Sequence, residues 1–231
     1  MTVRNPTAKE PRSGNSTARR RVAQEVARNA KRAVYRDLVL DAAGTAFARH
    51  GVPQTKMEQL AEEAGISLGT LYSVYKGKAE IVDAIHEARL REIHSASVEA
   101  ETAETNPLDA LLAGSRAYIT YFIENPDYLR MYLDEGTNWG VRNSMDRQSR
   151  RAAVWNDGVA QLAAIIQRGI DAEVFLPGRP DRLARMMLAM QQVQLADWFE
   201  DGMEADAKSV MEEVEILLRR AFCGQDERDR S

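Results

Sequence analysis

Residues 55–78 read TKMEQLAEEAGISLGTLYSVYKGK, and this stretch decides how the rest of the chain is interpreted. Two short helical patterns meet at Gly65, where a tight corner needs a left-handed backbone that glycine adopts without steric cost. Thr55 and Ser67 stand where each helix is expected to begin, and their hydroxyls can accept hydrogen bonds from free amide groups. The residues able to point inward between two steeply crossing helices are Leu60, Ala61, Ala64, Ile66, Leu71 and Val74. The stretch predicts a helix-turn-helix.

The outward face of the second helix is small and polar, which suits docking onto DNA. It consists of Leu68, Gly69, Thr70, Tyr72 and Ser73. Such a corner can also be plain helical-hairpin architecture, because a glycine flanked by apolar residues is weak evidence alone. The spacings taken together with both caps favour a DNA-binding element.

A longer amphipathic pattern precedes the corner. Apolar residues recur at helical spacing over three turns, at Tyr35, Leu38, Val39, Ala42, Ala43, Ala46 and Phe47. We expect a helix that lies across the two motif helices and ends near His50, with Gly51 as its C-terminal cap. His50 is then a helix-end residue rather than a ligand. Residues 34–78 are predicted to form a three-helix DNA-binding domain.

From Arg36 to Ile81 the sequence resembles the DNA-binding domain of the TetR-type bacterial transcriptional regulators. The resemblance covers about a fifth of the 231 residues and is specific, because its signals fall in one order with one spacing. They are Ala42, Ala43, Phe47, Ala48, Gly51, Thr55, Leu60, Ala61, the run Ala64 to Ser67, the run Gly69 to Tyr72, Tyr75, Lys78 and Glu80. The chain departs from the family at Tyr75, where phenylalanine is usual, and at Ala79, which separates Lys78 from Glu80.

The net charge of −4 conceals an asymmetry. Residues 1–78 carry 14 Lys and Arg against 7 Asp and Glu, whereas residues 79–231 carry 17 against 28. An acidic body repels a polyanion, so contact with DNA is confined to the basic end. Residues 1–33 are expected to be a basic, partly disordered arm, with disorder up to about residue 20 and a weak amphipathic pattern after Ala18 that could extend the first helix.

The bases have to be read without strong bidentate pairs, because the outward face of the second helix offers no Arg, Asn or Gln. We therefore expect help from Gln54, Lys56, the arginine arm and DNA shape. The resemblance implies that Thr55, Tyr72 and Lys78 hold phosphates, with Lys78 at the start of the next helix. The whole predicted DNA-contacting set is Arg19, Arg20, Arg21, Gln54, Thr55, Lys56, Ser67, Leu68, Gly69, Thr70, Tyr72, Ser73 and Lys78.

Residues 79–231 are predicted to form a helical effector-binding and dimerisation domain, so the expected fold class is all-α. Hairpin signals between alternating strands are missing. Helical patterns cover residues 79–105, 107–125, a stretch opening at Pro126, 146–171, 181–201 and 206–223. The last two are the most apolar pair and suit a homodimer interface, which the resemblance places in a four-helix bundle across a two-fold axis. The residues expected there are Leu183, Met187, Met190, Val210, Val214, Leu217 and Leu218, unless they cover their own domain's core.

Aromatic and methionine residues at helical spacing are ordinary core in most proteins, but the resemblance implies a small-molecule pocket in the second domain. The residues predicted to line it are Tyr118, Phe122, Tyr128, Met131, Tyr132, Trp139, Trp155 and Met186, with Gln191 as an orienting group. A large, flat, apolar compound suits this set. The resemblance then implies a repressor that holds a palindromic double-stranded operator as a homodimer and is released by its effector.

Two other classes of function are open. A helical-bundle enzyme would need repeated metal-binding motifs, yet only Asp83 and His86 approach one, with His94 two turns further on. We read both histidines as partly exposed helix residues, and we expect no catalytic residues, metal or cofactor. A ligand-independent architectural DNA binder would need only the basic end. Cys223 is the only cysteine, and no run approaches the length of a membrane span, so the protein is expected to be cytoplasmic with no membrane partner.

Overall fold

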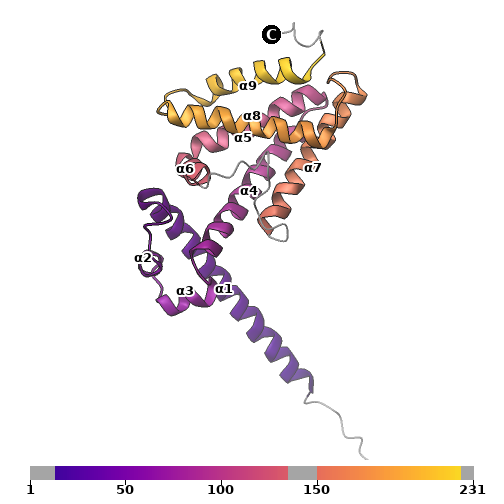
Figure 1. The fold of residues 1–231 in the computed structure, drawn as a ribbon. Coiled ribbons are helices and arrows are strands. Elements are labelled where there is room, and N and C mark those ends of the chain that lie inside the picture. The colour runs from indigo at the N-terminus through magenta and orange to yellow at the C-terminus, as the bar shows by residue number, and fades with distance from the viewer. Residues whose placement is uncertain (1–13, 135–149, 225–231) are drawn as a thin grey trace, which may run out of the picture.

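The computed structural model describes residues 14–134 and 150–224, and within them the chain is helical with no strand, which confirms the predicted all-α class. The elements differ by a few residues from the predicted ranges. They are α1 (Gly14–His50), α2 (Met57–Glu63), α3 (Leu68–Val74), α4 (Lys78–Thr102), α5 (Pro107–Glu124), α6 (Pro126–Asp134), α7 (Arg150–Asp171), α8 (Pro180–Glu200) and α9 (Ala207–Phe222). Figure 1 shows a small domain of α1 to α3 joined by α4 to a larger body of α5 to α9.

The small domain packs the second half of α1 across α2 and α3. Leu60 and Leu71 are fully buried beneath Val39 and its neighbours, because small residues on α1 let the helices approach closely. Gly51 ends α1 and Gly65 forms the corner, both with left-handed backbone (φ 77° and 65°), as their positions predicted. Among the apolar residues predicted to form the buried face of α1, Leu38 is exposed, so its prediction is wrong.

The first half of α1 projects from the small domain as a single helix with no packing partner among the described residues (Figure 1). The expectation of disorder up to about residue 20 is wrong from Gly14 onward, where α1 already begins. Residues 1–13 lie outside the described part of the chain. The pattern after Ala18 does extend the first helix, and α1 crosses the predicted domain boundary at residue 33 without a break.

Helix α4 connects the two parts of the molecule. Its first turns pack on α1, and the rest of the helix lies against α5 and α7 in the body. Ile81, Ile85, Leu90 and Ile93 are buried along its length, so one rigid rod contributes to both cores. The same helix is therefore part of both domains.

The body packs α5 against α4, α7, α8 and α9 around a core of large apolar side chains. At one edge, the segment after α7 is tied to the end of α9, because Leu176 N–H donates to the carbonyl oxygen of Phe222 at 2.7 Å. Phe175 and Cys223 face each other there, and both are buried. None of the described helices has the length and apolar character needed to cross a lipid bilayer.

Candidate functional site

The exposed face of α3 is organised by hydroxyl groups. Ser67 caps the helix as expected, because its Oγ accepts the Thr70 amide at 3.1 Å and also lies 2.8 Å from Thr70 Oγ1. Ser73 Oγ donates to the carbonyl oxygen of Thr70 at 2.6 Å. Tyr72 stands out from this surface and is 49 % exposed. Leu68 is only partly exposed and packs against the core, so its predicted outward orientation holds only in part.

Thr55 is not the cap of α2, and its predicted role is wrong on both counts. The capping position is Lys56, and the Thr55 hydroxyl instead donates to the carbonyl oxygen of Gly51 at 2.8 Å. The residue is fully buried, so its side chain offers nothing to a phosphate in this conformation. Its work is to close the turn between α1 and α2.

Lys78 begins α4 as predicted, but its ammonium is engaged inside the protein. Nζ donates to the carbonyl oxygens of Val52 and Pro53 at 2.8 and 2.9 Å, and its predicted phosphate contact stays a prediction. Lys78 therefore fixes the loop that carries Gln54 and Lys56, both of which are exposed.

Tyr75, the departure from the family pattern, is buried at the C-terminal end of α3. The Arg36 guanidinium lies 4.5 Å from the centre of its ring and donates to the carbonyl oxygen of Val74. Burial raises the pKa of the Tyr75 hydroxyl, an effect that Arg36 partly opposes. Arg36 thus ties α1 to the end of α3.

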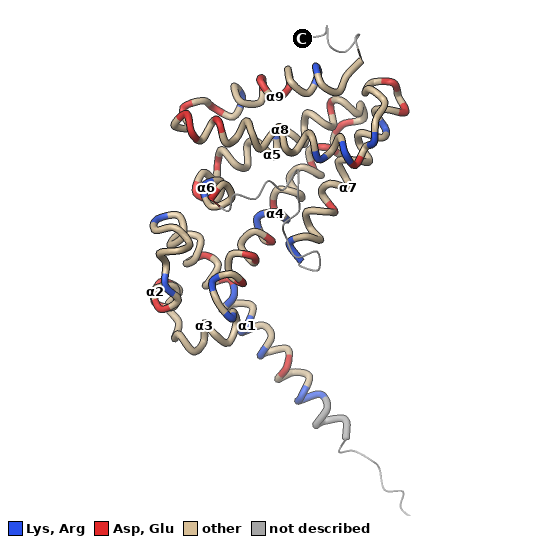
Figure 2. The backbone as a smooth tube through the Cα atoms, in the orientation of Figure 1, with Lys and Arg blue, Asp and Glu red and all other residues tan. Residues whose placement is uncertain are grey.

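Positive charge lies on the free half of α1. Arg19, Arg20 and Arg21 are exposed there, and Figure 2 shows basic residues recurring along this helix while acidic ones mark the ends of α8 and α9. The helix leaves the small domain beside α3 rather than across the body. The structure thus brings the predicted arm and the α3 face to the same end of the molecule.

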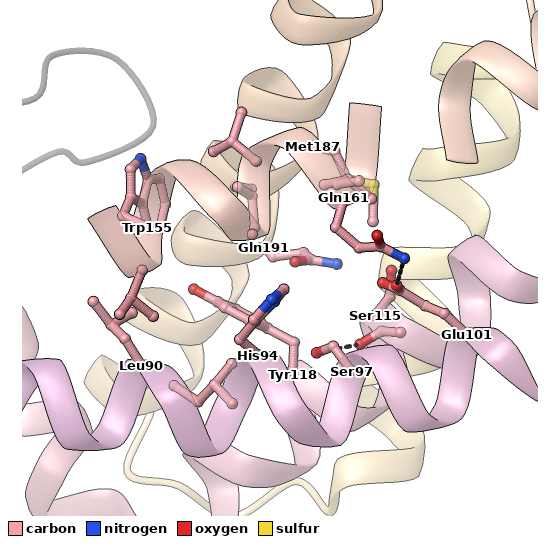
Figure 3. A pocket seen from close by; sticks show the side chains of 17 residues that line it. Leu90, His94, Ser97, Glu101, Ser115, Tyr118, Trp155, Gln161, Met187 and Gln191 are labelled. Atoms are coloured by element: carbon pink, nitrogen blue, oxygen red, sulfur yellow. Dashed lines mark hydrogen bonds between the residues drawn. The ribbon is translucent and has the colours of Figure 1, made fainter. Parts of the chain in front are cut away.

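A cavity of about 70 Å³ lies in the body between α4, α5, α7 and α8 (Figure 3). Most of its wall is apolar, including Leu90, Trp155 and Met187. One side is polar, and there Glu101 Oε2 accepts a hydrogen bond from Gln161 Nε2 at 3.4 Å. The Glu101 side chain is buried, and this burial raises the pKa of its carboxyl, while Gln161 and the Arg168 charge act in the opposite direction.

The comparisons with known proteins bear on the small domain first. Residues 39–85 match the model of the amino-terminal domain described as "Bacterial regulatory proteins, tetR family". The small domain is therefore a TetR-type DNA-binding domain.

Two curated proteins extend the similarity beyond this TetR-type domain. The chain is 24 % identical to the uncharacterized HTH-type transcriptional regulator YhgD of Bacillus subtilis over 191 residues, which are 78 % of this chain and 93 % of that protein. It is 27 % identical to the HTH-type transcriptional repressor SCO4008 of Streptomyces coelicolor over 127 residues, which are 52 % of this chain and 62 % of that protein.

A solved structure shares the TetR-type fold. The transcriptional regulator FadR of Bacillus subtilis, in complex with stearoyl-CoA, aligns with a TM-score of 0.67 at 18 % identity, over 78 % of this chain and 96 % of that chain. This similarity shows the arrangement of a small helix-turn-helix domain and a larger helical body.

The predicted effector residues lie in different places in the structure. Tyr118, Trp155 and Gln191 line the cavity. Phe122, Tyr128 and Tyr132 form a buried aromatic cluster beside it, and Tyr128 and Met131 border a separate cleft between α1, α4 and α6. Met186 is wrong as an effector residue, because it is exposed on α8, and Trp139 lies outside the described residues.

Sequence reasoning missed the polar wall. His94, Ser97 and Glu101 follow Leu90 along one face of α4, at the four- and three-residue spacing that aligns side chains on a helix. This spacing of polar residues, ending in a carboxylate, is the sequence feature that could have predicted the polar wall. His86 was also misjudged, since it is fully buried with Nδ1 3.1 Å from Tyr128 Oη, whereas His94 is partly exposed as predicted.

The predicted dimer residues divide according to burial. Met187, Val210, Val214 and Leu218 belong to the chain's own core, so this part of the prediction is wrong. Leu183, Met190 and Leu217 are partly exposed. The strongly exposed apolar residues on these helices are Met186, Val193 and Ile216, none of which was predicted at the dimer interface.

Proposed function

We propose that this regulator is a repressor that binds a palindromic operator as a homodimer and leaves it when a small molecule occupies the body cavity. The observation that carries the proposal is the double role of α4. Its first residue, Lys78, holds the loop before α2, and its later residues Leu90, His94 and Glu101 form one wall of the cavity.

The DNA contacts proposed are those that the protein leaves exposed. Tyr72, Ser73 and Gly69 enter the major groove on α3, and Gln54 and Lys56 flank it from the loop. Arg19, Arg20 and Arg21 on the free half of α1 contact phosphates or the minor groove. The hydroxyls of Ser67 and Thr70 are hydrogen-bonded to each other, so these two residues position the α3 surface and make weaker contacts with DNA.

The homodimer is proposed to form through α8 and α9. Leu183, Met186, Met190 and Val193 share one face of α8, because they follow one another at intervals of three or four residues. Met186 and Val193 are more than half exposed, and Ile216 on α9 is also exposed. Pairing this face across a two-fold axis buries apolar surface and sets the spacing between the two α3 helices.

Release by a ligand follows from linkage. If an occupied cavity displaces the body half of α4, the DNA-competent spacing and the ligand-bound body exclude each other. A coupling free energy of about 1–3 kcal/mol changes operator affinity roughly 5- to 150-fold, enough to switch a promoter. The description of SCO4008 as a repressor and the stearoyl-CoA bound by FadR support this assignment. Operator binding also implies a cytoplasmic location.

Selection of bound sequences from a random DNA pool tests the proposal. The expected product is an inverted repeat, bound with at least about a thousandfold preference over unrelated duplex at physiological salt. Equal binding to every duplex would instead support the architectural alternative. Sedimentation of the free protein as a lone subunit would also contradict the operator-bound dimer.

A further inference from the structure

The polar wall of the cavity contains two groups whose hydrogen-bonding capacity is not fully used among the described residues. The Glu101 carboxylate is 93 % buried and receives one long hydrogen bond from Gln161. The Gln191 side chain is 99 % buried, and its Nε2 has no hydrogen-bond partner in the part of the chain that the structure describes. A buried donor and a buried carboxylate without full partners both cost stability, which is the usual sign of a site for something else.

The fold makes room for this carboxylate. A Cβ atom placed on Gly114 of α5 would lie 2.5 Å from Glu101 Oε1 and 2.8 Å from Cγ, so an alanine there would displace the carboxylate from its present position. Figure 3 shows Glu101 and Gln161 meeting at one side of the cavity, with the Gln191 amide directed toward that side. Ser97 Oγ, on the same wall, donates to the carbonyl oxygen of Gly114 at 3.4 Å.

The wall favours a cation over an anion. The described lining residues include Glu101 and His94 but no Lys or Arg, and the Arg168 charge acts on Glu101 from outside this lining. An acyl-CoA headgroup or a fatty-acid carboxylate would therefore meet a carboxylate, with no cationic side chain lining the cavity to bind it. An ammonium group would supply the charge and the hydrogen-bond donors that Glu101 lacks.

Resting on the proposed function, we propose that the effector is a small apolar amine, with its ammonium group on Glu101 and a hydrogen-bond acceptor on Gln191 Nε2. Apolar parts of the compound lie against Trp155 and Leu90 at the other side of the cavity. The cavity of about 70 Å³ is less than half the roughly 150 Å³ that accommodates benzene. A compound with an aromatic ring therefore has to push α4, α7 or α8 outward.

Three compounds that share a phenoxypropyl group and differ in their terminal group test which ligand charge the cavity prefers. They are 3-phenoxypropylamine, 3-phenoxypropan-1-ol and 3-phenoxypropanoate, titrated into the full-length protein by isothermal calorimetry at neutral pH. We expect the amine to bind about tenfold or more tightly than the alcohol and the acid, since a buried charged hydrogen bond is lost in both. Equal affinities, a tighter acid, or no binding of the amine at about 1 mM would each overturn the proposal.

Variants assign the two contacts separately. Glu101→Gln is expected to remove the preference for the amine, whereas Glu99→Gln, exposed on the same helix, should retain it. Gln191→Leu should weaken all three probes alike, because the ether oxygen is common to them. Gly114→Ala should reproduce the Glu101→Gln result with the carboxylate still present. An amine preference that survives both Glu101→Gln and Gly114→Ala in folded protein contradicts the assignment.

The DNA assay separates this inference from the function on which it rests. If the amine binds through Glu101 but leaves operator affinity unchanged, the ligand class stands and effector control fails. If no amine binds while the protein selects an inverted repeat, operator binding stands and the ligand class fails.

Discussion

Lys78 connects two elements through a pair of charge-assisted hydrogen bonds. Its ammonium lies on the carbonyl oxygens of Val52 and Pro53, which belong to the loop between α1 and α2. The loop carries Lys56, whose charge is exposed and free to meet a phosphate. The two lysines are therefore expected to act on DNA in different ways.

Replacement of each lysine by alanine separates these roles. Lys56→Ala should lower the slope of log affinity against log salt by about one, because one phosphate contact is lost. Lys78→Ala should leave the slope nearly unchanged but weaken binding to all sequences, since the loop loses its anchor. Fluorescence anisotropy at several salt concentrations measures both. A reduced slope only in Lys78→Ala would support its role as a phosphate donor.

Glu101 should reduce the stability of the empty protein. Its pKa is raised above the ordinary 4.5, so between the two values the folded protein binds more protons than the unfolded chain. Stability therefore falls as pH rises through this window. The groups that face the Glu101 carboxyl are Gln161 and Arg168 on α7 and His94 on α4.

Glu101→Gln removes this titration and should raise the melting temperature at neutral pH. The difference from the native protein should shrink as pH falls to 4.5 and below, where the native carboxyl becomes protonated in both states. Circular-dichroism melts at several pH values check this. A variant that is less stable at neutral pH would show that Glu101 is a structural residue.

At the scale of elements, the end of α7 depends on the absence of one side chain. A Cβ on Gly169 would lie 2.0 Å from Cδ2 of Phe175, whose ring is buried against the chain. The same segment is tied to α9 through Leu176 N–H and the carbonyl oxygen of Phe222. The close approach of ring and helix backbone therefore holds α7 and α9 together.

Gly169→Ala should destabilise the protein by about 1–3 kcal/mol, because the ring has to move within a packed core. Gly44→Ala is the matched control, since it is also in a helix but meets no atom within 4 Å. That change should be neutral or stabilise by up to about 1 kcal/mol. Urea denaturation measures both, and equal effects would contradict the packing argument.

The first half of α1 extends away from the small domain and does not pack against another described element. Replacement of Arg19, Arg20 and Arg21 by alanine preserves helix propensity and removes three exposed charges. The salt slope of operator binding should decrease by up to about three, with an unchanged melting temperature. The control replaces Arg116 and Arg182, exposed on the body, and should leave the slope unaltered. An unaltered slope in the arm variant would exclude α1 from the DNA contact.

At the scale of the whole molecule, the proposed function depends on how two subunits pair. Val193→Asp and Ile216→Asp place a charge on exposed apolar positions of α8 and α9 without disturbing the chain's own core. Each should shift the protein toward monomer in analytical ultracentrifugation, because desolvating an unpaired carboxylate is costly. Val26→Asp, equally exposed on α1, is the control. If both variants remain dimers, the interface lies elsewhere on the protein.

The small domain was predictable because the residues that form its turns and helix caps are required by their neighbours in the sequence. Gly51 and Gly65 are needed where φ is positive, and Ser67 caps the helix that follows it in sequence. Helical periodicity similarly located α4 to α9 within a few residues. These features depend on neighbours one or two turns away, which a linear sequence contains.

Residue accessibility depended on the tertiary structure. The neighbouring sequence does not show that Thr55 is fully buried, and Lys78 donates to carbonyl oxygens 25 and 26 residues away. The apolar stripe of α9 packs inward, which leaves Ile216 exposed.

The sequence by itself determined the helical class, the helix-turn-helix and the separation of basic and acidic halves, since composition and short-range spacing suffice for these. Only the tertiary structure decided which apolar face is left uncovered and that Glu101, Gln161 and Gln191 share one cavity wall. The physical reason is that burial and polar pairing depend on which helices meet, and those helices lie up to 90 residues apart in the chain.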